Sequence, residues 1–279
     1  MTLPPPATAF FLPTSTGSRF CLYHAPAVDR ATPALANILH VHAFAEEMNK
    51  CRRMAALHAR ALAVQGCAVL QIDLYGCGDS SGDFADARWD IWKTDLDTAL
   101  EWLQARRAAP VTLWGDRLGA LLALDYAREQ RQPIDRLLLW QPVFEGKQYM
   151  TQFLRLRLAH EILDGGDQKS GGTQGLRTAL QAGQEVEVAG YALAPDLVAT
   201  VDTLSAGHWH LPVRSLHWLE LTAAGKTLTP ARQRVAQGWQ ELGNPLQLHA
   251  LPGTAFWNSQ EVGLAPAWLD AGNTIFGTP

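Results

Sequence analysis

Short apolar runs alternate with amphipathic helical stretches along most of this sequence, and that alternation limits the possible folds more than any other feature. The runs 35–42, 68–74, 111–114 and 134–140 are apolar at most positions. Strands of this kind are buried on both faces, which is typical of a parallel sheet covered by helices on both sides. The sequence therefore predicts an α/β fold with a mostly parallel, doubly wound sheet.

Helical spacing of apolar residues fills the intervals between these runs. One helix is predicted from about Met48 to a stop near Gly66, and two more at about 87–107 and 118–128. The later elements follow in order: a strand at 213–221, a helix at 230–242, a strand at 246–251 and a terminal helix from about Leu264.

The chain opens in a different way. Two short apolar runs, 10–12 and 20–23, are separated by Thr14-Ser15-Thr16-Gly17-Ser18. This composition is typical of two antiparallel strands joined by a glycine-containing turn. An N-terminal antiparallel hairpin is therefore expected beside the parallel strands.

The alternation is interrupted between residues 144 and 206. A helical stretch with Tyr149 and Phe153 leads into a polar, glycine-rich segment at 165–175. We interpret 144–206 as a cap inserted into a single domain of residues 1–279, lying over the edge of the sheet where the preceding strand ends. The glycine-rich tip offers few apolar side chains to anchor it, so it is predicted to be the most mobile part and the first cleaved by proteases.

One motif occupies the place of a catalytic nucleophile. The run Gly115-Asp116-Arg117-Leu118-Gly119 follows a strand and starts a helix, which is the setting of the G-x-S-x-G nucleophile elbow of the α/β-hydrolase fold. The glycines stand where the sharp turn needs them, but the middle residue is Arg117. A guanidinium stays protonated and has no lone pair to attack with.

The remaining triad positions point the same way. The acid of an α/β-hydrolase follows the penultimate strand, where Glu220 is the candidate, and the base follows the last strand, where Phe256 stands. A Ser-His-Asp mechanism is therefore excluded at the usual positions. Asp116 could act as nucleophile only if the turn shifted by one residue, and that shift would place the bulky Trp114 and Leu118 where the turn needs small residues.

A polar loop after the first parallel strand supplies the other candidate groups. Glu46 and Glu47 lie at a helix start, where carboxylates also compensate the positive end of the helix. In the hydrolase fold this loop supplies one oxyanion amide, here that of Phe44, and the elbow supplies the other, from Leu118. His42, at a strand end, is a candidate general base.

A half-buried Arg117 requires a counter-charge. We therefore expect a carboxylate of the 42–50 loop, or Glu220, within about 4 Å of its guanidinium. The glycine-rich loop 73–83 has the shape of a hydrolase turn, and Ser80 within it is expected to make a structural hydrogen bond.

Composition removes several classes of function. With 23 Lys+Arg against 27 Asp+Glu, and no long basic run, the chain lacks the charge pattern of nucleic-acid or membrane-surface binding. No signal peptide or membrane span is predicted, so the protein is expected to be soluble and cytoplasmic. The four cysteines lack ligand spacing, which predicts buried thiols, no disulfide, no metal and no cofactor.

Several pieces of the sequence together resemble one known family. They are Phe44-Ala45-Glu46-Glu47-Met48-Asn49-Lys50, Asp73-Leu74-Tyr75-Gly76-Cys77-Gly78-Asp79-Ser80, Gly82-Asp83-Phe84, Trp114-Gly115-x-Arg117-Leu118-Gly119 and Phe256-Trp257. The chain resembles, over nearly its full length, the second of the two α/β-hydrolase-like families associated with the exosortase A system. This resemblance implies an α/β-hydrolase fold, an elbow arginine, and partners encoded with exosortase, PEP-CTERM sorting and exopolysaccharide genes of Gram-negative bacteria.

Two classes of function stay open from the sequence. In the first, an enzyme acts on an ester, thioester or glycan-linked acyl group, with Arg117 as an anion or oxyanion clamp and Glu46, Glu47 or His42 transferring protons, and Glu220 as a further candidate. An acyltransferase would use the same site. In the second, a non-catalytic binding or scaffold protein holds an anionic ligand or an assembly partner in the same pocket.

Overall fold

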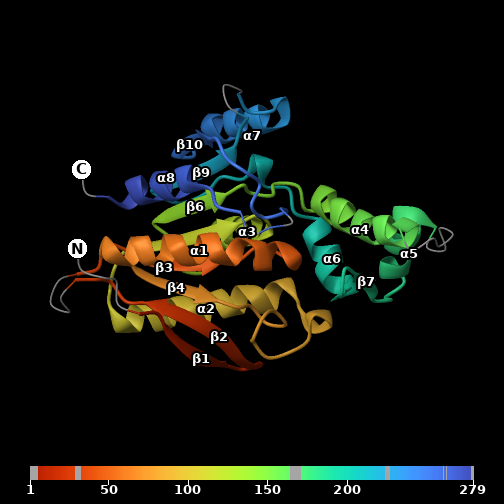
Figure 1. The fold of residues 1–279 in the computed structure, drawn as a ribbon, viewed down its shortest axis with the longest axis horizontal. Coiled ribbons are helices and arrows are strands. Elements are labelled where there is room, and N and C mark those ends of the chain that lie inside the picture. Colours follow the sequence, from red (N-terminus) through yellow and green to blue (C-terminus); the bar gives the residue numbers. More distant parts are fainter. Residues whose placement is uncertain are drawn as a thin grey trace.

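One eight-stranded sheet organises the molecule (Figure 1). The computed structural model describes residues 6–28, 33–163, 171–223, 227–259, 261 and 263–277. The sheet has the order β1-β2-β4-β3-β5-β6-β9-β10. Its strands are β1 (Thr8–Thr14), β2 (Gly17–His24), β3 (Asn37–Val41), β4 (Ala68–Ile72), β5 (Val111–Asp116), β6 (Arg136–Trp140), β9 (Ser215–Leu221) and β10 (Leu246–Leu251).

The strand directions confirm the predicted topology. β1 pairs with β2, and β2 with β4, in antiparallel fashion, while every other pairing in the sheet is parallel. β3 lies between β4 and β5, so the order of the strands reverses there. Ligand sites of open α/β sheets lie outside the carboxyl ends of the strands at such a reversal. The elbow follows β5 at this place.

Helices cover both faces of the sheet (Figure 1). On one face, α1 (Glu46–Val64) and α8 (Pro266–Phe276) pack over a core rich in tryptophan. On the other face lie α2 (Trp89–Arg106), α3 (Leu118–Glu129) and α7 (Pro230–Glu241). These buried layers hold the strand ends, and hence the elbow, in fixed positions.

Residues 144–206 form a separate group of elements at one end of the sheet, on the right in Figure 1. Glu145 and Ser205 pair as an isolated bridge where the segment leaves and rejoins the domain. Of the predicted glycine-rich tip, residues 165–170 lie outside the described residues, and the remainder begins a helix. The elements are α4 (Gly146–Leu163), α5 (Gly172–Gln181), β7 (Val186–Val188), β8 (Tyr191–Leu193) and α6 (Pro195–Asp202), followed by the 3₁₀ turn η2 (Ala206–His208).

Element boundaries differ from prediction by one or two residues at several strand starts. β6 begins at Arg136 rather than residue 134, and β9 at Ser215 rather than 213. Asp135 explains both differences. Its carboxylate accepts a hydrogen bond from the amide of Val111, and its carbonyl accepts from the amides of Arg214 and Ser215. Asp135 thus joins three strand starts and stays outside the regular ladder.

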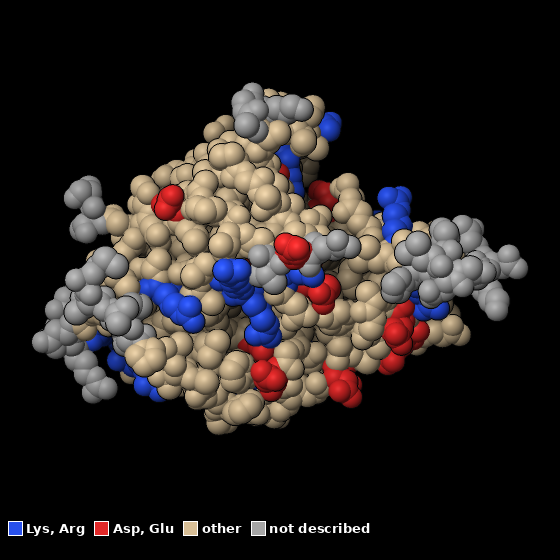
Figure 2. Space-filling view, viewed as in Figure 1, with Lys and Arg blue, Asp and Glu red and all other residues tan. Residues whose placement is uncertain are grey.

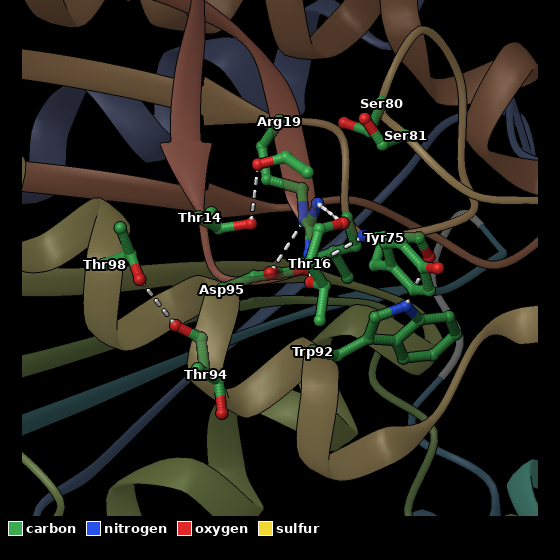
Figure 3. A network of polar contacts seen from close by, with 12 residues as sticks. Thr14, Thr16, Arg19, Tyr75, Ser80, Ser81, Trp92, Thr94, Asp95 and Thr98 are labelled. Atoms are coloured by element: carbon green, nitrogen blue, oxygen red, sulfur yellow. Dashed lines mark hydrogen bonds and ion pairs between the residues drawn. The ribbon is translucent and has the colours of Figure 1, made fainter.

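The glycine-rich loop after β4 is fastened to the N-terminal hairpin (Figure 3). Ser80 accepts a hydrogen bond from the amide of Phe20 and donates one to the carbonyl of Asp73, which confirms its predicted structural role. The loop continues into the short 3₁₀ turn η1 (Phe84–Asp86). Its hydrolase-like shape is therefore explained by contacts within the fold.

A buried ion pair lies under the same loop (Figure 3). Arg19 is fully buried, and its Nε donates to Asp95 Oδ1 at 2.7 Å. The amide of Tyr75 donates to the other Asp95 oxygen at 2.8 Å, and burial raises the pKa of Asp95 to about 6. These bonds join β2, α2 and the loop, and they place Arg19 and Asp95 in the scaffold.

The four cysteines are free thiols and all are buried, as predicted. Among the described residues, each helix is too short or too polar to cross a bilayer.

Candidate active-site cleft

The backbone of the nucleophile elbow is present at Arg117. This residue has φ 55° and ψ −115°, a strained conformation for any side chain except glycine. A Cβ atom on Gly115 would lie 2.5 Å from the Cα of Ala120, and one on Gly119 would lie 2.2 Å from the carbonyl oxygen of His42. Both glycines are therefore required by packing, and the turn raises the Arg117 side chain over the carboxyl edge of the sheet.

Arg117 forms the predicted ion pair. Its Nε and Nη2 each lie 3.1 Å from Glu47 Oε1, and its Nη1 donates to the carbonyl of Gln141 at 3.2 Å. The other Glu47 oxygen accepts a hydrogen bond of 2.7 Å from the hydroxyl of Tyr149, which belongs to α4. This confirms the expectation of a carboxylate from the 42–50 loop and adds a partner from the insert.

Neighbouring residues keep Arg117 in its charged form and Tyr149 in its neutral form. Burial opposes ionisation of Arg117, but Glu47, together with Tyr149 and Cys51, more than offsets that effect and the pKa of Arg117 is raised. Burial, together with the Glu47 carboxylate, also raises the pKa of Tyr149 well above its ordinary value. The tyrosine therefore keeps its proton and serves as a donor to Glu47.

An aromatic side chain occupies the position of the catalytic base. The guanidinium carbon of Arg117 lies 5.3 Å from the centre of the Trp257 ring and 5.8 Å from that of Tyr149. Phe256, expected from the sequence at the base position, instead packs in the core against Trp140 and Trp268. The residue that faces the elbow is thus one position further along the chain than the sequence suggested, because the turn after β10 directs Phe256 inward.

Glu220 lies at the acid position but does not contact Arg117. Its Oε2 accepts from the indole of Trp218 at 2.8 Å, and its Oε1 accepts from the Gln141 side chain at 2.8 Å and lies 3.2 Å from Arg232 Nε. Burial raises the pKa of Glu220, an effect that Arg232 partly offsets. Gln141 links Arg117 to Glu220: its side-chain amide donates to Glu220, and its backbone carbonyl accepts from Arg117.

His42 does not contact the side chain of Arg117. Its Nδ1 bonds to the carbonyl of Ala43 at 2.7 Å, and its Nε2 accepts from the amide of Leu74 at 3.2 Å. Burial lowers the pKa of His42. With Phe44 and Leu118 it lines a separate cavity of about 10 Å³ beneath the elbow, which is room for about one water molecule. Both nitrogens of His42 are therefore engaged by backbone groups.

Glu46 lies on the exposed side of the 42–50 loop. Its side chain is 53% exposed, accepts a hydrogen bond from Asn49 at 3.0 Å and lies 3.7 Å from Lys50. The hydroxyl of Tyr191, from β8 of the insert, lies 3.5 Å from the same carboxylate. Glu46 and Glu47 thus both face the insert, but Glu47 alone of the two binds Arg117.

Two cavities flank Arg117, and together we name them the elbow cleft. The first, of about 270 Å³, is the polar lobe and the second, of about 370 Å³, is the apolar lobe. Arg117, Tyr149 and Gln152 border both lobes. Glu145, Gln148, Thr229 and Arg232 complete the polar side of the first lobe, whereas Phe153, Leu156 and Trp257 line the second.

The α4 helix supplies one wall of the cleft. Gln148, Tyr149, Gln152, Phe153 and Leu156 follow helical spacing along one face. Sequence reasoning recognised the apolar part of this stripe as a cap helix but missed its two glutamines, as well as Arg232 in the polar lobe and Gln141, which bonds to Arg117. Helical spacing could have indicated the two glutamines of α4, whereas Gln141 lies outside any helix and carried no such signal.

The cleft contains hydrogen-bond donors and aromatic rings but lacks a nucleophile–base pair. Among the described residues that line its two lobes there is no serine, cysteine or histidine. Thr229 has the one aliphatic hydroxyl there, and it caps the start of α7. In the part of the chain that the structure describes, no group of three or more His, Cys, Asp or Glu side chains is placed to hold a metal ion.

Comparisons with known proteins place this geometry in context. The sequence matches the family described as Serine aminopeptidase, S33, over residues 32–186, which is more than half of the chain. Among curated proteins, no relative matches the sequence.

Solved structures resemble the whole chain at low sequence identity. A highly thermostable carboxyl esterase from Bacillus coagulans has a TM-score of 0.63 at 12% identity, with 98% of this chain and 97% of that chain covered. Est1E from Butyrivibrio proteoclasticus has a TM-score of 0.62 at 13% identity, with 96% of each chain covered. An α/β serine hydrolase without lid from Xanthomonas campestris has a TM-score of 0.56 at 16% identity, covering 99% of this chain and 98% of that one. These likenesses establish the α/β-hydrolase fold.

Proposed function

We propose, from the premise that this chain belongs to the serine aminopeptidase, S33 family of the α/β-hydrolase superfamily, that its elbow cleft binds an uncharged acyl ligand without forming an acyl-enzyme. One observation carries the proposal: the elbow backbone is intact, but it presents a guanidinium already bonded to Glu47. Acyl-enzyme chemistry needs a lone pair at that position, and a guanidinium offers only donors.

The two carboxylates that pair with the arginines of the cleft support binding over catalysis. Both oxygens of Glu47 accept hydrogen bonds, from Arg117 and Tyr149, and both oxygens of Glu220 are similarly engaged. A general base must reach the proton that it abstracts. These carboxylates act instead as counter-charges that hold two half-buried guanidiniums in place.

The balance of charge favours an uncharged ligand. Arg117 is paired with Glu47, Arg232 with Glu220 and Lys50 with Glu46. The other charged group that lines the cleft is itself a carboxylate, Glu145, which accepts a hydrogen bond from Ser205 at 2.7 Å. Figure 2 shows acidic and basic side chains interspersed on the visible face. An anion would have to compete with a carboxylate for each guanidinium, so we propose an uncharged ester or glycan-linked acyl group in place of the anion expected from the sequence.

The two lobes indicate how such a ligand lies. Phe153, Leu156 and Trp257 give the apolar lobe a surface for an acyl chain or aromatic ring. Gln148 and Gln152 place amide groups toward the polar lobe, where they suit the hydroxyl groups of a polyol or sugar. The Arg117 guanidinium, between the lobes, is in position to donate to the linking carbonyl.

Glycerol monobutyrate, an uncharged acyl-polyol ester, is a direct probe. We expect saturable binding by calorimetry and no release of butyrate above the rate in buffer. Phe153→Asp should abolish binding by placing a charge in the apolar lobe, whereas Leu248→Ala, on the exposed edge strand β10, should leave it unchanged. Butyrate release that is proportional to protein concentration, or equal binding by the Phe153→Asp variant, would contradict the proposal.

A hydrolase or acyltransferase that uses water or an acceptor directly is the second candidate. The observation in its favour is the position of Glu47, which is 20% exposed beside Arg117 at the junction of the lobes. In this case Arg117 would polarise an ester or thioester carbonyl and Glu47 would accept the proton. Turnover that is lost in Glu47→Gln and kept in Glu46→Gln would select this alternative.

We further propose the narrower assignment to the exosortase A-associated family, with a cytoplasmic location and partner proteins from exosortase and exopolysaccharide loci. The motif from Phe44 to Lys50 and the Gly-x-Arg-x-Gly elbow support it. The chromosomal neighbourhood provides the test, since an exosortase gene beside this one is expected. A neighbourhood without exosortase or polysaccharide genes would contradict it.

A further inference from the structure

A further cavity lies between α1 and the edge of the sheet formed by β2, β4 and β3. It has a volume of about 180 Å³ and shares no lining residue with the elbow cleft. Phe20, Leu22, Met48, Ala55 and Ile72 contribute most of its apolar wall. The ion pair between Arg52 and Asp73, at 3.1 Å, lines its polar end.

A histidine held by a carboxylate forms the inner wall of this cavity. The Nε2 of His40 lies 2.9 Å from Asp116 Oδ2, and His40 and Asp116 are 4% and 1% exposed. A carboxylate accepts hydrogen bonds, so Nε2 carries a proton, and in the neutral ring Nδ1 keeps a lone pair. No described residue is paired with His40 Nδ1, and the ring borders the cavity.

The same pair leaves a second polar atom without a partner. Asp116 Oδ1 is buried and accepts no hydrogen bond from any described residue. An unsatisfied buried acceptor is destabilising, so a purely structural pair would be expected to complete its bonding. A carboxylate that fixes the tautomer of a histidine whose ring borders a cavity is instead the arrangement of a binding or proton-transfer site.

We propose that this cavity, which we name the His40 cavity, is a binding site for a small, largely apolar molecule with one hydroxyl group that donates to His40 Nδ1. The apolar wall suits a ring or short chain, and an apolar cavity of about 150 Å³ is known to be large enough for benzene. His42, on the same wall, has both nitrogens engaged by backbone groups, so His40 supplies the free histidine acceptor. The ligand class is thus a small alcohol or phenol.

Phenol and toluene are matched probes because they differ by one hydroxyl group. Phenol is expected to bind about tenfold more tightly than toluene, the effect of one additional hydrogen bond. In protein with ¹⁵N-labelled histidine, phenol should shift the Nδ1 resonance of His40 and leave that of the exposed His210 unchanged.

Two variants separate the hydrogen bond from the volume. His40→Phe should lower the affinity for phenol to that for toluene, because the acceptor is removed. Ala55→Leu should weaken both probes by filling the cavity without touching the pair, while Ala61→Leu, on the same helix but outside the cavity, should change neither. Thermal melting of each variant establishes that it is folded.

The result that supports the site is saturable phenol binding with a shift of His40 Nδ1 and a preference over toluene that His40→Phe removes. Failure of phenol to bind at millimolar concentration, binding without a shift at His40, or equal affinities for the two probes would each overturn it. Because the cavity is separate from the elbow cleft, none of these outcomes bears on the binding of glycerol monobutyrate.

Discussion

His58 should make the protein sensitive to acid, and replacing it should reduce that sensitivity by a defined amount. The ring is fully buried between Trp114 and Trp140, at centroid distances of 4.7 and 5.1 Å. Neither of its nitrogens has a partner among the described residues. Burial lowers the pKa of His58 from 6.5 to about 3, so the folded protein holds the ring in its neutral form.

The magnitude follows from the difference between the folded and unfolded states. The unfolded histidine takes up a proton as the pH falls through 6.5, whereas the folded one stays neutral until about pH 3. Stability is therefore fully present above the unfolded pKa and is lost as the pH falls below it. At about 1.36 kcal/mol per pH unit, the loss from His58 between pH 7 and pH 5 is about 2 kcal/mol.

Urea unfolding followed by tryptophan fluorescence at pH 7 and pH 5 measures this loss. The fall in unfolding free energy between the two values should be about 2 kcal/mol smaller in His58→Phe than in the wild type, whatever the stability of the variant at pH 7. Other buried histidines contribute equally to both proteins and cancel. His210→Asn, at an exposed position, should keep the wild-type difference. Equal losses in His58→Phe and the wild type would refute the reasoning.

Two further predictions concern the elbow itself. Arg117→Ala should destabilise the fold by about 3 kcal/mol, the lower end of the cost of breaking a buried ion pair. It should destabilise more than Glu47→Gln, because removal of the larger side chain also leaves a void. Calorimetric melting that ranks the two variants in the opposite order would contradict this. Gly119→Ala should destabilise the fold by at least about 3 kcal/mol, since the added Cβ would lie 2.2 Å from the carbonyl oxygen of His42. A melting temperature close to that of the wild type would contradict this prediction and show that the elbow can rearrange.

The fold could be predicted from the sequence because buried positions recur as a periodic pattern of apolar residues. Runs such as 137–140 are apolar on both faces, and that pattern predicts a central parallel strand without knowledge of its neighbours. The elbow was recognisable for a related reason: Gly115 and Gly119 stand where any Cβ would collide with backbone atoms. Steric requirements of this kind fix residue types at fixed spacing.

The partners of the cleft were less accessible because they depend on the positions of side chains from distant segments. Pairing of Arg117 with a nearby carboxylate followed from charge alone, but the choice of Glu47 over Glu220 depends on Gln141 and Arg232, which bind Glu220. The bond from Tyr149 to Glu47 joins residues 102 positions apart, and no local pattern encodes it. Likewise, the turn after β10 decides that Trp257, rather than Phe256, faces the elbow.

Reaction with a fluorophosphonate probe, measured by intact mass, tests most directly the claim that this elbow carries no nucleophile. With Arg117 at the elbow and no serine or cysteine among the described residues that line the cleft, the protein should gain no adduct mass at saturating probe, while a serine esterase treated in parallel becomes fully labelled. A saturable adduct of one probe per chain, mapped to any serine and prevented by prior binding of glycerol monobutyrate, would contradict the account.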